Sequence, residues 1–561
     1  MQLPRKTVSP AWLLALWFIV NLVQAALTPL DADETYYWMY ASQLDWGYFD
    51  HPPAVAVLIS LGKDWLPGAL GLRLGHVLAG TATISVIWHL LASPKGKLLW
   101  LAAALIAAQP FLNVYGFIAT PDGPLLLFSA LYLLAYRRFL DAPSLARGAA
   151  WGLTMAGLLY SKYHGLMLIV FTVLPHLGFL LRQPGAWVAA LGGAALYAPH
   201  LYWQYANDFP SFRYHLSGRD DAYELKYTLE YLGNQLVIFS PLLVYHYVQT
   251  FRRDDDRGDR FAKACRWLVV GFLGFFLYTT TKGGTEAQWT ALLSLPLVYL
   301  TFRAARDRFP EWQPQIFRLA VITVFLLTVA RLLLIAPRDW LPFPKPFDHE
   351  PWTERLATVA GDRPLLVQNS YRIASAYEFY TGRPAWTFTD VEYRRNQYDL
   401  WTADSVFHGQ EVLLLGQRTW EAPDATPFRT HTRDMRYRVV PDFQVLKELE
   451  LIHSQPLPDT VSADQTYPLT VTARPPRQIG LGRALPLNLF LTFYYADGRM
   501  DVLRLKPLAT GRLSAGRDNL VYDGPFKIPA DAPAGPARYE IGFGYEGMPP
   551  LRGGTFGVLI R

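Results

Sequence analysis

The chain of 561 residues contains one cysteine, Cys265, which excludes an internal disulfide framework. Charged residues make up only 17% of the chain, whereas 51% of the residues are hydrophobic and 15% are aromatic. The mean hydropathy of +0.11 is too high for a soluble chain of this length. The sequence also lacks internal repeats and low-complexity tracts. This composition predicts a membrane protein.

Apolar stretches that could cross a bilayer fill the first 340 residues. A helix of about 20 residues crosses ~30 Å of hydrocarbon. We expect about eleven crossings, near residues 12–27, 72–92, 98–117, 122–138, 148–160, 165–181, 186–204, 231–250, 266–281, 287–303 and 316–336. The first follows Arg5 and Lys6 but lacks a small-residue cleavage site, which predicts an uncleaved anchor. The shorter apolar segment Ala54–Leu66 is expected to lie in the membrane interface.

Basic residues alternate between successive turns of this bundle. Every second turn is basic, and these turns hold Lys95, Lys97, Arg137, Arg138, Arg147, Arg182, Arg252, Arg253, Arg257, Arg260, Lys263, Arg266, Arg303, Arg306, Arg308 and Arg318. The opposite turns hold few Lys or Arg residues. The positive-inside rule then places the N-terminus in the cytoplasm and the C-terminal region outside it. The same residues account for the net charge of +6 without a nucleic acid partner.

The character of the sequence changes after Pro337. A proline-rich linker over Pro337–Pro351 follows the last apolar stretch. Mixed helical and short strand patterns then predict a small α/β unit, and from about residue 440 alternating strands between Gly, Pro and Asp turns predict a β-sandwich. We expect three domains, which comprise the transmembrane domain 1–340 with a first external loop at 29–53, the α/β region 341–440 and the β-sandwich 441–561.

The first external loop holds an unusual density of acids. Asp31, Asp33 and Glu34 lie within four positions, and Asp50 and His51 follow before two prolines. Adjacent carboxylates repel one another at the mouth of a bundle, which is unfavourable for stability. A carboxylate placed there can instead take a proton from an acceptor group. Asp33 and Glu34 are therefore the predicted catalytic pair.

Other polar residues collect in the turns on the same side. With Asp50 and His51, the candidate donor-binding residues are Asp122, Lys162, Tyr163, Arg213, Lys282 and Glu286. Each has an ordinary structural explanation, because an acid can cap a helix N-terminus, a lone lysine can snorkel, and aromatic residues can form an interfacial belt. Their concentration on one side favours an active site in which the cations hold the phosphate of a lipid-linked sugar.

These residues resemble motifs of the GT-C glycosyltransferases in the protein O-mannosyltransferase and lipid A aminoarabinose-transferase group. The resemblance covers about residues 10–305 and depends on the ordered set Asp33–Tyr37, Gly47–Pro53, Thr120–Leu125, Leu158–Gly165 and Glu286–Trp289. It implies that Asp33, with Glu34 beside it, supplies the catalytic base. The family's second acid matches Asp122, and a second family lysine matches Lys162. The aminoarabinose transferases have a lysine at the position of His51.

The resemblance further implies a GT-C fold, a polyprenyl-phosphate sugar donor, inversion at the anomeric carbon and no required metal. His51 with Asp50 provides too few ligands for a divalent ion. The sequence thus predicts a glycosyltransferase of the bacterial inner membrane with an extracytoplasmic site, whose acceptor is a protein, lipid A or a glycan. Two rivals are a transporter or flippase of lipid-linked sugars and a membrane-anchored carbohydrate-binding protein. The first would place polar residues at mid-depth of the bundle, and the second would not need Asp33.

Overall fold

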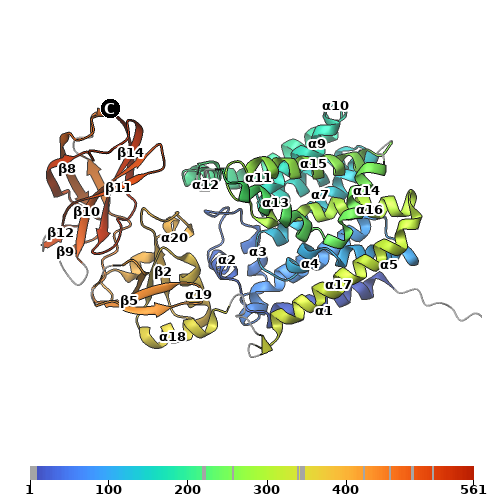
Figure 1. Cartoon of the computed structure of the whole chain (residues 1–561), viewed down its shortest axis with the longest axis horizontal. Coiled ribbons are helices and arrows are strands. Elements are labelled where there is room, and N and C mark those ends of the chain that lie inside the picture. Colours follow the sequence, from blue (N-terminus) through green and yellow to red (C-terminus); the bar gives the residue numbers. More distant parts are fainter. Residues whose placement is uncertain are drawn as a thin grey trace, which may run out of the picture. The chain divides into compact units, whose positions relative to one another are not determined.

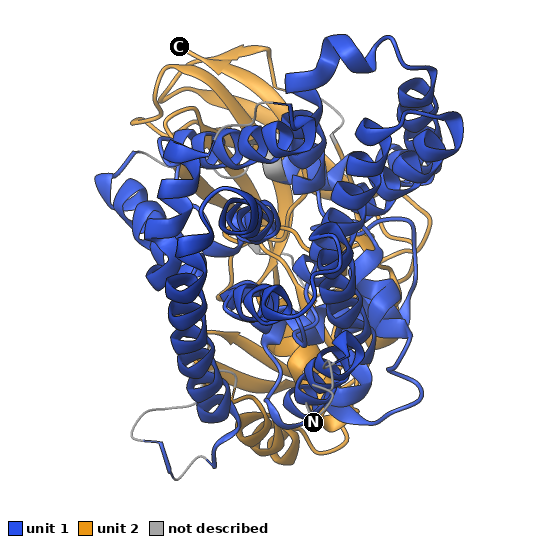
Figure 2. Cartoon of the chain, turned by 90° about the vertical axis from the view of Figure 1, so that its right-hand side faces the viewer, with its two compact units in different colours: residues 1–347 blue, residues 348–561 orange. Residues whose placement is uncertain are grey.

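The chain begins with a helical part and ends with a β-rich part (Figure 1). The computed structural model describes residues 9–217, 223–254, 258–337, 340–341, 348–420, 422, 424–453, 457–481, 486–507 and 511–561. Residues 1–347 form one compact unit, unit 1, and residues 348–561 form a second, unit 2 (Figure 2).

Unit 1 is helical throughout its described residues. Its α-helices are α1 Pro10–Leu27, α2 Ala32–Ser42, α3 Ala54–Ser60, α4 Gly68–Leu90, α5 Lys97–Ala107, α6 Pro110–Val114, α7 Asp122–Asp141, α8 Leu145–Ser161, α9 His164–Val173, α10 Leu177–Leu180, α11 Pro184–Ala206, α12 Pro210–Ser217, α13 Leu225–Ile238, α14 Val244–Arg253, α15 Arg260–Thr279, α16 Ser294–Asp307 and α17 Gln313–Ile335. Short 3₁₀ helices are η1 Leu174–His176, η2 Pro241–Leu243, η3 Ala287–Leu293 and η4 Pro310–Trp312.

Four helical stretches are long and apolar enough to span a membrane, namely α1, α4, α15 and residues 310–335. Each of the eleven predicted crossings coincides with a helix or a run of helices, but their number in the membrane stays a prediction. Three predicted crossings are interrupted at prolines, and in the crossing near 165–181 Pro175 lies in η1, between α9 and α10. Pro110 begins α6 after α5 has ended, and Pro241 separates α13 from α14, because proline lacks the N–H that an uninterrupted helix needs.

The core of unit 1 is built from aromatic and aliphatic side chains of α4, α7, α8, α15 and α16. On α7, Tyr136 and Phe139 stack on Trp151 of α8 with ring centroids 4.8 and 5.2 Å apart. The short helix α3 lies directly against α4, since a side chain at Gly75 would meet the carbonyl oxygen of Leu58 at 2.0 Å. This close approach fixes the segment that follows His51.

From its polarity we expected residues 29–53 to form an external loop throughout. The structure instead contains a helix within this segment. Residues 32–42 form α2, capped by Asp31. The alternation of apolar and polar residues is weak there, and the helix is instead fixed by its capping box and by the burial of Tyr36 and Tyr40. The interfacial segment Ala54–Leu66 contains α3, and Trp65 at its end is 82% exposed.

Unit 2 starts with an α/β region, as the sequence predicted. Its strands are β1 Leu365–Gln368, β2 Ala385–Phe388, β3 Val412–Gln417, β4 Thr426–Arg429 and β5 Asp434–Val440, in the order β2-β1-β3-β5-β4. The pairs β1–β2 and β1–β3 are parallel, and β5 runs antiparallel to β3 and β4. The helices of this region are α18 Glu350–Ala360, α19 Tyr371–Thr381, α20 Gln397–Leu400 and the 3₁₀ helix η6 Ala403–Phe407.

The rest of unit 2 is β-rich, which confirms the predicted order of fold types. Its strands are β6 Glu450–His453, β7 Thr460–Val461, β8 Thr466–Arg474, β9 Ile479–Leu481, β10 Leu487–Tyr495, β11 Met500–Pro507, β12 Gly511–Leu513, β13 Asn519–Lys527, β14 Gly535–Tyr545 and β15 Gly554–Ile560. They form a five-stranded sheet β11-β10-β14-β15-β7, a three-stranded sheet β13-β8-β6 and the pair β12-β9.

Candidate active site

The start of α2 presents the predicted catalytic acids in one helical turn. Asp31 is the N-cap, and its Oδ1 accepts a hydrogen bond of 2.8 Å from the backbone N–H of Asp33. Asp33 is half-buried in the first turn of the helix. Aspartate is favoured at both positions because it satisfies backbone N–H groups and meets the positive end of the helix dipole. These capping interactions therefore fix Asp31 and Asp33 at the helix start.

Glu34 lies beneath this turn in a closed set of hydrogen bonds. Arg73 of α4 donates from Nε and Nη2 to the two carboxylate oxygens at 2.7 and 2.5 Å. The backbone N–H groups of Ala119 and Asp31 donate to the same carboxylate at 2.8 and 3.0 Å. Both ionised side chains are buried. Glu34 thus joins α2, α4 and the segment before α7 through four hydrogen bonds, two of them from the Arg73 guanidinium.

Asp50 is held by phenols that come from α2. Tyr36 and Tyr40 donate from their hydroxyls to Asp50 Oδ2 at 2.9 and 3.2 Å. Burial, with the nearby Tyr36 and Asp50, raises the pKa of Tyr40 well above its ordinary value, so this hydroxyl keeps its proton and donates it. His51 is half-buried, and its ring packs edge-on against Tyr37 at 5.7 Å. The segment containing residues 50–51 is therefore fixed on the α2 aromatic residues.

Asp122 and Lys162 form a buried ion pair between α7 and the end of α8. Lys162 Nζ donates to both carboxylate oxygens of Asp122, at 2.8 and 3.0 Å. Both side chains are less than 8% exposed. Asp122 is the first residue of α7, and Lys162 is the C-cap residue that follows α8, so the pair also joins two helix termini. Two of the three ammonium hydrogens are engaged by Asp122, which leaves one for a ligand.

Tyr163, the residue after Lys162, belongs to a hydrogen-bond network with side chains of α11. Its hydroxyl lies 3.1 Å from His200 Nε2, and His200 Nδ1 lies 2.8 Å from the carbonyl oxygen of Trp46. With Nδ1 protonated, His200 donates to Trp46 and accepts from Tyr163. Gln204 donates to the Tyr163 hydroxyl at 2.9 Å. The network ties the start of α9 and the helix α11 to the first external loop.

Of the three remaining candidates, Glu286 is exposed and lies near the others. The hydroxyl of Tyr115 is close enough to interact electrostatically with the carboxylates of Asp122, Glu286 and Asp31. The motif that Glu286 begins also reaches the Lys162 segment, because the ring of Trp289 lies 5.7 Å from that of His164.

Arg213 and Lys282 are both exposed. Arg213 of α12 forms a two-nitrogen ion pair with Asp208.

Three contributors were not predicted from the sequence. Arg73, His200 and Gln204 each lie inside an apolar stretch, where polar side chains are costly and mark functional or structural contacts. That rule could have identified Arg73, but not its partner, because Glu34 is 39 positions away. As for metals, the described ranges contain no group of three or more His, Cys, Asp or Glu side chains arranged to hold an ion.

Comparison with known proteins supports an assignment of the fold. The family model for dolichyl-phosphate-mannose-protein mannosyltransferase matches residues 50–203. Lipid A galacturonosyltransferase RgtD of Rhizobium johnstonii (strain DSM 114642 / LMG 32736 / 3841) is 25% identical over 311 residues, which are 51% of this chain and 64% of that relative. The match therefore spans less than two thirds of the relative's length.

Solved structures of ArnT from Cupriavidus metallidurans resemble the chain over most of its length. The apo structure gives a TM-score of 0.58 at 13% identity, over 76% of this chain and 97% of ArnT. This chain has the GT-C fold. ArnT bound to undecaprenyl phosphate gives a TM-score of 0.55 at 15% identity, over 77% of this chain and 98% of that one. The predicted resemblance to GT-C glycosyltransferases is thereby confirmed, and the protein is an integral membrane protein.

Within this GT-C fold, the family match starts at Asp50 and ends at Trp203. It includes the Asp122–Lys162 pair and Tyr163 with His200, whereas Asp33 and Glu34 precede it. The roles of all these residues in the reaction stay predictions.

Proposed function

We propose that the chain is a glycosyltransferase that moves a sugar from a polyprenyl-phosphate-linked donor to an acceptor. The observation that carries the proposal is the placement of Asp33 in the first turn of α2, next to the buried pair Glu34–Arg73. Tyr115 interacts electrostatically with both Asp31, the N-cap of that helix, and Asp122, so the buried pair Asp122–Lys162 lies in the same part of unit 1. Asp33 is half-buried, whereas Glu34 and Asp122 are buried in ion pairs. The match to RgtD and the mannosyltransferase family model supports sugar transfer as the reaction.

In this mechanism Asp33 is the general base. It takes the proton of the acceptor group as the acceptor atom bonds to the anomeric carbon, and the bond from that carbon to the phosphate oxygen breaks. The polyprenyl phosphate leaves with the bonding electron pair. A single displacement of this kind inverts the anomeric centre. A positioned base of this type typically contributes about 10²–10⁴ in rate.

Glu34 has a different role in the proposal, although the sequence placed it beside Asp33 as a second catalytic acid. Its oxygens accept four hydrogen bonds, which occupy the lone pairs that a base needs. We assign it to positioning α2 against α4.

Lys162 and His51 are the proposed contacts of the donor phosphate. Lys162 has one ammonium hydrogen beyond those that Asp122 accepts, and a phosphate there would gain a charge-assisted hydrogen bond as its charge develops. His51 would contribute a positive charge when protonated. Asp50 interacts electrostatically with Tyr163, so the two segments are close to each other. This mechanism needs no metal ion, so a chelator should leave the transferase activity of the protein unchanged.

The orientation proposed from charge places the N-terminus in the cytoplasm and the site and unit 2 on the periplasmic side of a bacterial inner membrane. A donor whose isoprenoid tail stays in the bilayer would meet the site at that surface. The acceptor is a protein, lipid A or a glycan, and the match to RgtD favours lipid A.

Mass spectrometry of envelope lipids and glycans tests the proposal in cells. Cells that lack the chain should lose a species heavier by one sugar, and the wild type and the surface variant Asp64→Asn should restore it. The Asp33→Asn variant should not restore it. If Asp33→Asn restored the heavier species, the assignment of Asp33 as the general base would be refuted. Unchanged envelope sugars, with a lipid-linked sugar retained on the cytoplasmic face, would favour a flippase.

A further inference from the structure

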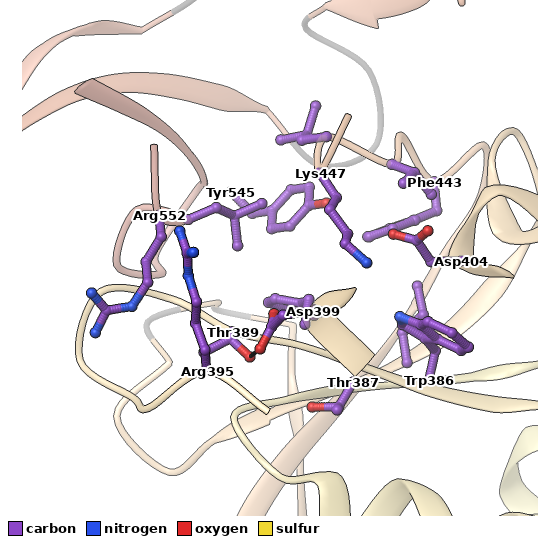
Figure 3. A pocket seen from close by; sticks show the side chains of 15 residues that line it. Trp386, Thr387, Thr389, Arg395, Asp399, Asp404, Phe443, Lys447, Tyr545 and Arg552 are labelled. Atoms are coloured by element: carbon purple, nitrogen blue, oxygen red, sulfur yellow. Dashed lines mark hydrogen bonds between the residues drawn. The ribbon is translucent and has the colours of Figure 1, made fainter. Parts of the chain in front are cut away.

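Unit 2 contains a cavity of about 220 Å³, which is lined by residues of both its α/β region and its β-rich region. The residues that decide its chemistry are Trp386, Asp399, Asp404, Phe443, Lys447 and Tyr545 (Figure 3). They come from β2, α20, η6, the segment after β5, and β14. Ligand pockets for drug-sized molecules measure about 300–1,000 Å³, so this cavity suits a smaller molecule.

Asp404 gives the cavity a buried acceptor. The residue is only 6% exposed, and among the described residues its Oδ1 has no hydrogen-bond donor. A buried carboxylate oxygen without a donor is unfavourable, and most such atoms have a partner in folded proteins. Burial accordingly raises the pKa of Asp404. A ligand hydroxyl at this position would supply the missing donor.

Lys447 supplies a donor beside that acceptor. Its ammonium donates to the carbonyl oxygens of Tyr398, at 2.8 Å, and Trp401, which hold the group in place. Two of its three hydrogens are thereby used, and the third remains for a ligand. Figure 3 shows the ammonium pointing into the cavity near Asp404, and the two groups interact electrostatically. Donor and acceptor thus lie side by side.

Aromatic rings form the apolar part of the wall. Trp386 and Tyr545 are 6% and 3% exposed. The ring of Tyr545 is fixed by Phe443 at 5.2 Å and by Phe388 at 5.5 Å, and its hydroxyl donates to the carbonyl oxygen of Gln444 at 3.0 Å. A molecule that enters therefore meets fixed ring surfaces together with one acceptor and one donor.

We propose that this cavity binds a single uncharged pyranose unit. Neighbouring hydroxyls of a sugar can donate to Asp404 Oδ1 and accept from Lys447 Nζ, while the C–H face of the ring packs on an aromatic wall. Asp399 and Asp404 line the cavity together with Lys447, Arg395 and Arg552, so acidic and basic side chains offset one another and an uncharged ligand needs no counter-charge. Of the nearby arginines, Arg552 already donates to the carbonyl oxygens of Val391 and Tyr393 at 3.1 and 3.0 Å.

The proposal concerns binding by unit 2 and is independent of sugar transfer by unit 1. Asp33 lies in unit 1, so Asp33→Asn should bind the same sugar as the wild type even if it transfers none. A protein without transferase activity that still binds the sugar would refute the proposed function alone.

The test is a titration of the full-length protein in phosphatidylcholine nanodiscs, which avoid the sugar head groups of maltoside detergents. The probes are the methyl pyranosides of glucose, galactose and mannose, with glucuronate and cyclohexanol as comparison ligands. At least one methyl pyranoside should bind the wild type more tightly than either comparison ligand. Asp404→Asn should bind it about tenfold or more weakly. The surface variant Lys527→Met should bind it normally, since Lys527 is 58% exposed.

A second variant guards against misfolding. Trp386→Leu should also bind weakly, and each variant should keep the thermal unfolding midpoint of the wild type within a few degrees. If no methyl pyranoside binds up to about 100 mM, which corresponds to a binding free energy of about −1.4 kcal/mol, the proposal is overturned. Tighter binding of glucuronate, or equal binding by a folded Asp404→Asn variant, would overturn it as well.

Discussion

Three carboxylates that look alike in the sequence differ in what surrounds them. Asp33 is half-buried at a helix start, Glu34 is fully buried with Arg73, and Asp50 accepts from two tyrosines. Their adjacent positions in the sequence predict the same catalytic role for Asp33 and Glu34. The difference comes from a helix geometry that directs successive side chains about 100° apart, so that one acid faces the bundle and its neighbour does not. Only contacts far apart in sequence resolve their roles.

Arg73→Met should strongly destabilise unit 1. The substitution leaves Glu34 buried without its cation, and breaking a buried pair in this way typically costs about 3–5 kcal/mol. Thermal unfolding of the purified protein measures the loss. Lys226→Met, which removes an exposed pair with Glu224, is the matched control and should unfold like the wild type. Equal unfolding midpoints for both variants would contradict a stabilising role for the Glu34–Arg73 pair.

Glu378 on α19 predicts a pH dependence in unit 2. Burial raises its pKa from 4.5 to about 7, so the folded state keeps a proton that the unfolded state releases at lower pH. Its contribution to stability is therefore present below about pH 4.5 and is lost as the pH rises to about 7, a change on the order of 3 kcal/mol.

Glu378→Gln isolates that contribution. His349, whose pKa burial lowers to about 4, acts in the opposite direction, because stability rises with pH while only the unfolded state is protonated. The informative quantity is therefore the wild-type unfolding free energy minus that of Glu378→Gln, followed from pH 4 to 8. This difference should fall with rising pH. A constant difference would contradict the shifted pKa of Glu378.

At the scale of elements, hydrophobic stretches predicted the helices of unit 1 well, and alternating patterns predicted the strands of unit 2. The helix α2 was not predicted, because its apolar face is built from tyrosines whose hydroxyls bind Asp50. The α7–α8 pairing could be inferred only from the resemblance, since Asp122 and Lys162 are 40 positions apart. The cavity of unit 2 gave no sequence signal, because its wall comes from segments that lie far apart in the sequence.

Asp31→Ala should loosen the first turn of α2. The variant loses the capping box, which typically costs about 1 kcal/mol, and amide hydrogen exchange over residues 32–42 should become faster. Ser144→Ala removes the N-cap of α8 and is the matched control. It should accelerate exchange in α8 and leave α2 unchanged. Unaltered exchange in α2 of the Asp31→Ala variant would show that packing alone fixes this helix.

At the scale of the whole molecule, the two units divide the proposed tasks. Unit 1 has the GT-C fold and holds the candidate active site, and unit 2 holds the proposed sugar cavity. The comparisons establish the fold, whereas the orientation of the chain in the membrane depends on the distribution of Lys and Arg between turns.

Cysteine labelling tests that orientation. Cys265 is buried and can be replaced by alanine, after which single cysteines are introduced at the exposed positions Asp497 in unit 2 and Asp141 at the end of α7. In spheroplasts an impermeant maleimide should label Asp497→Cys, and it should label Asp141→Cys only after permeabilisation. The reverse pattern would place unit 2 in the cytoplasm.

The most direct measurement of the central claim is transfer by the purified protein. Wild-type protein in nanodiscs is mixed with polyprenyl-phosphate donors that carry a labelled sugar and with an envelope extract from cells that lack the chain. The release of polyprenyl phosphate and the appearance of the labelled sugar on an acceptor are both measured. We predict transfer by the wild type and by Asp64→Asn, and a rate at least about 100-fold lower for Asp33→Asn. Equal rates for Asp33→Asn and the wild type would contradict the account, as would a wild type that transfers from none of these donors.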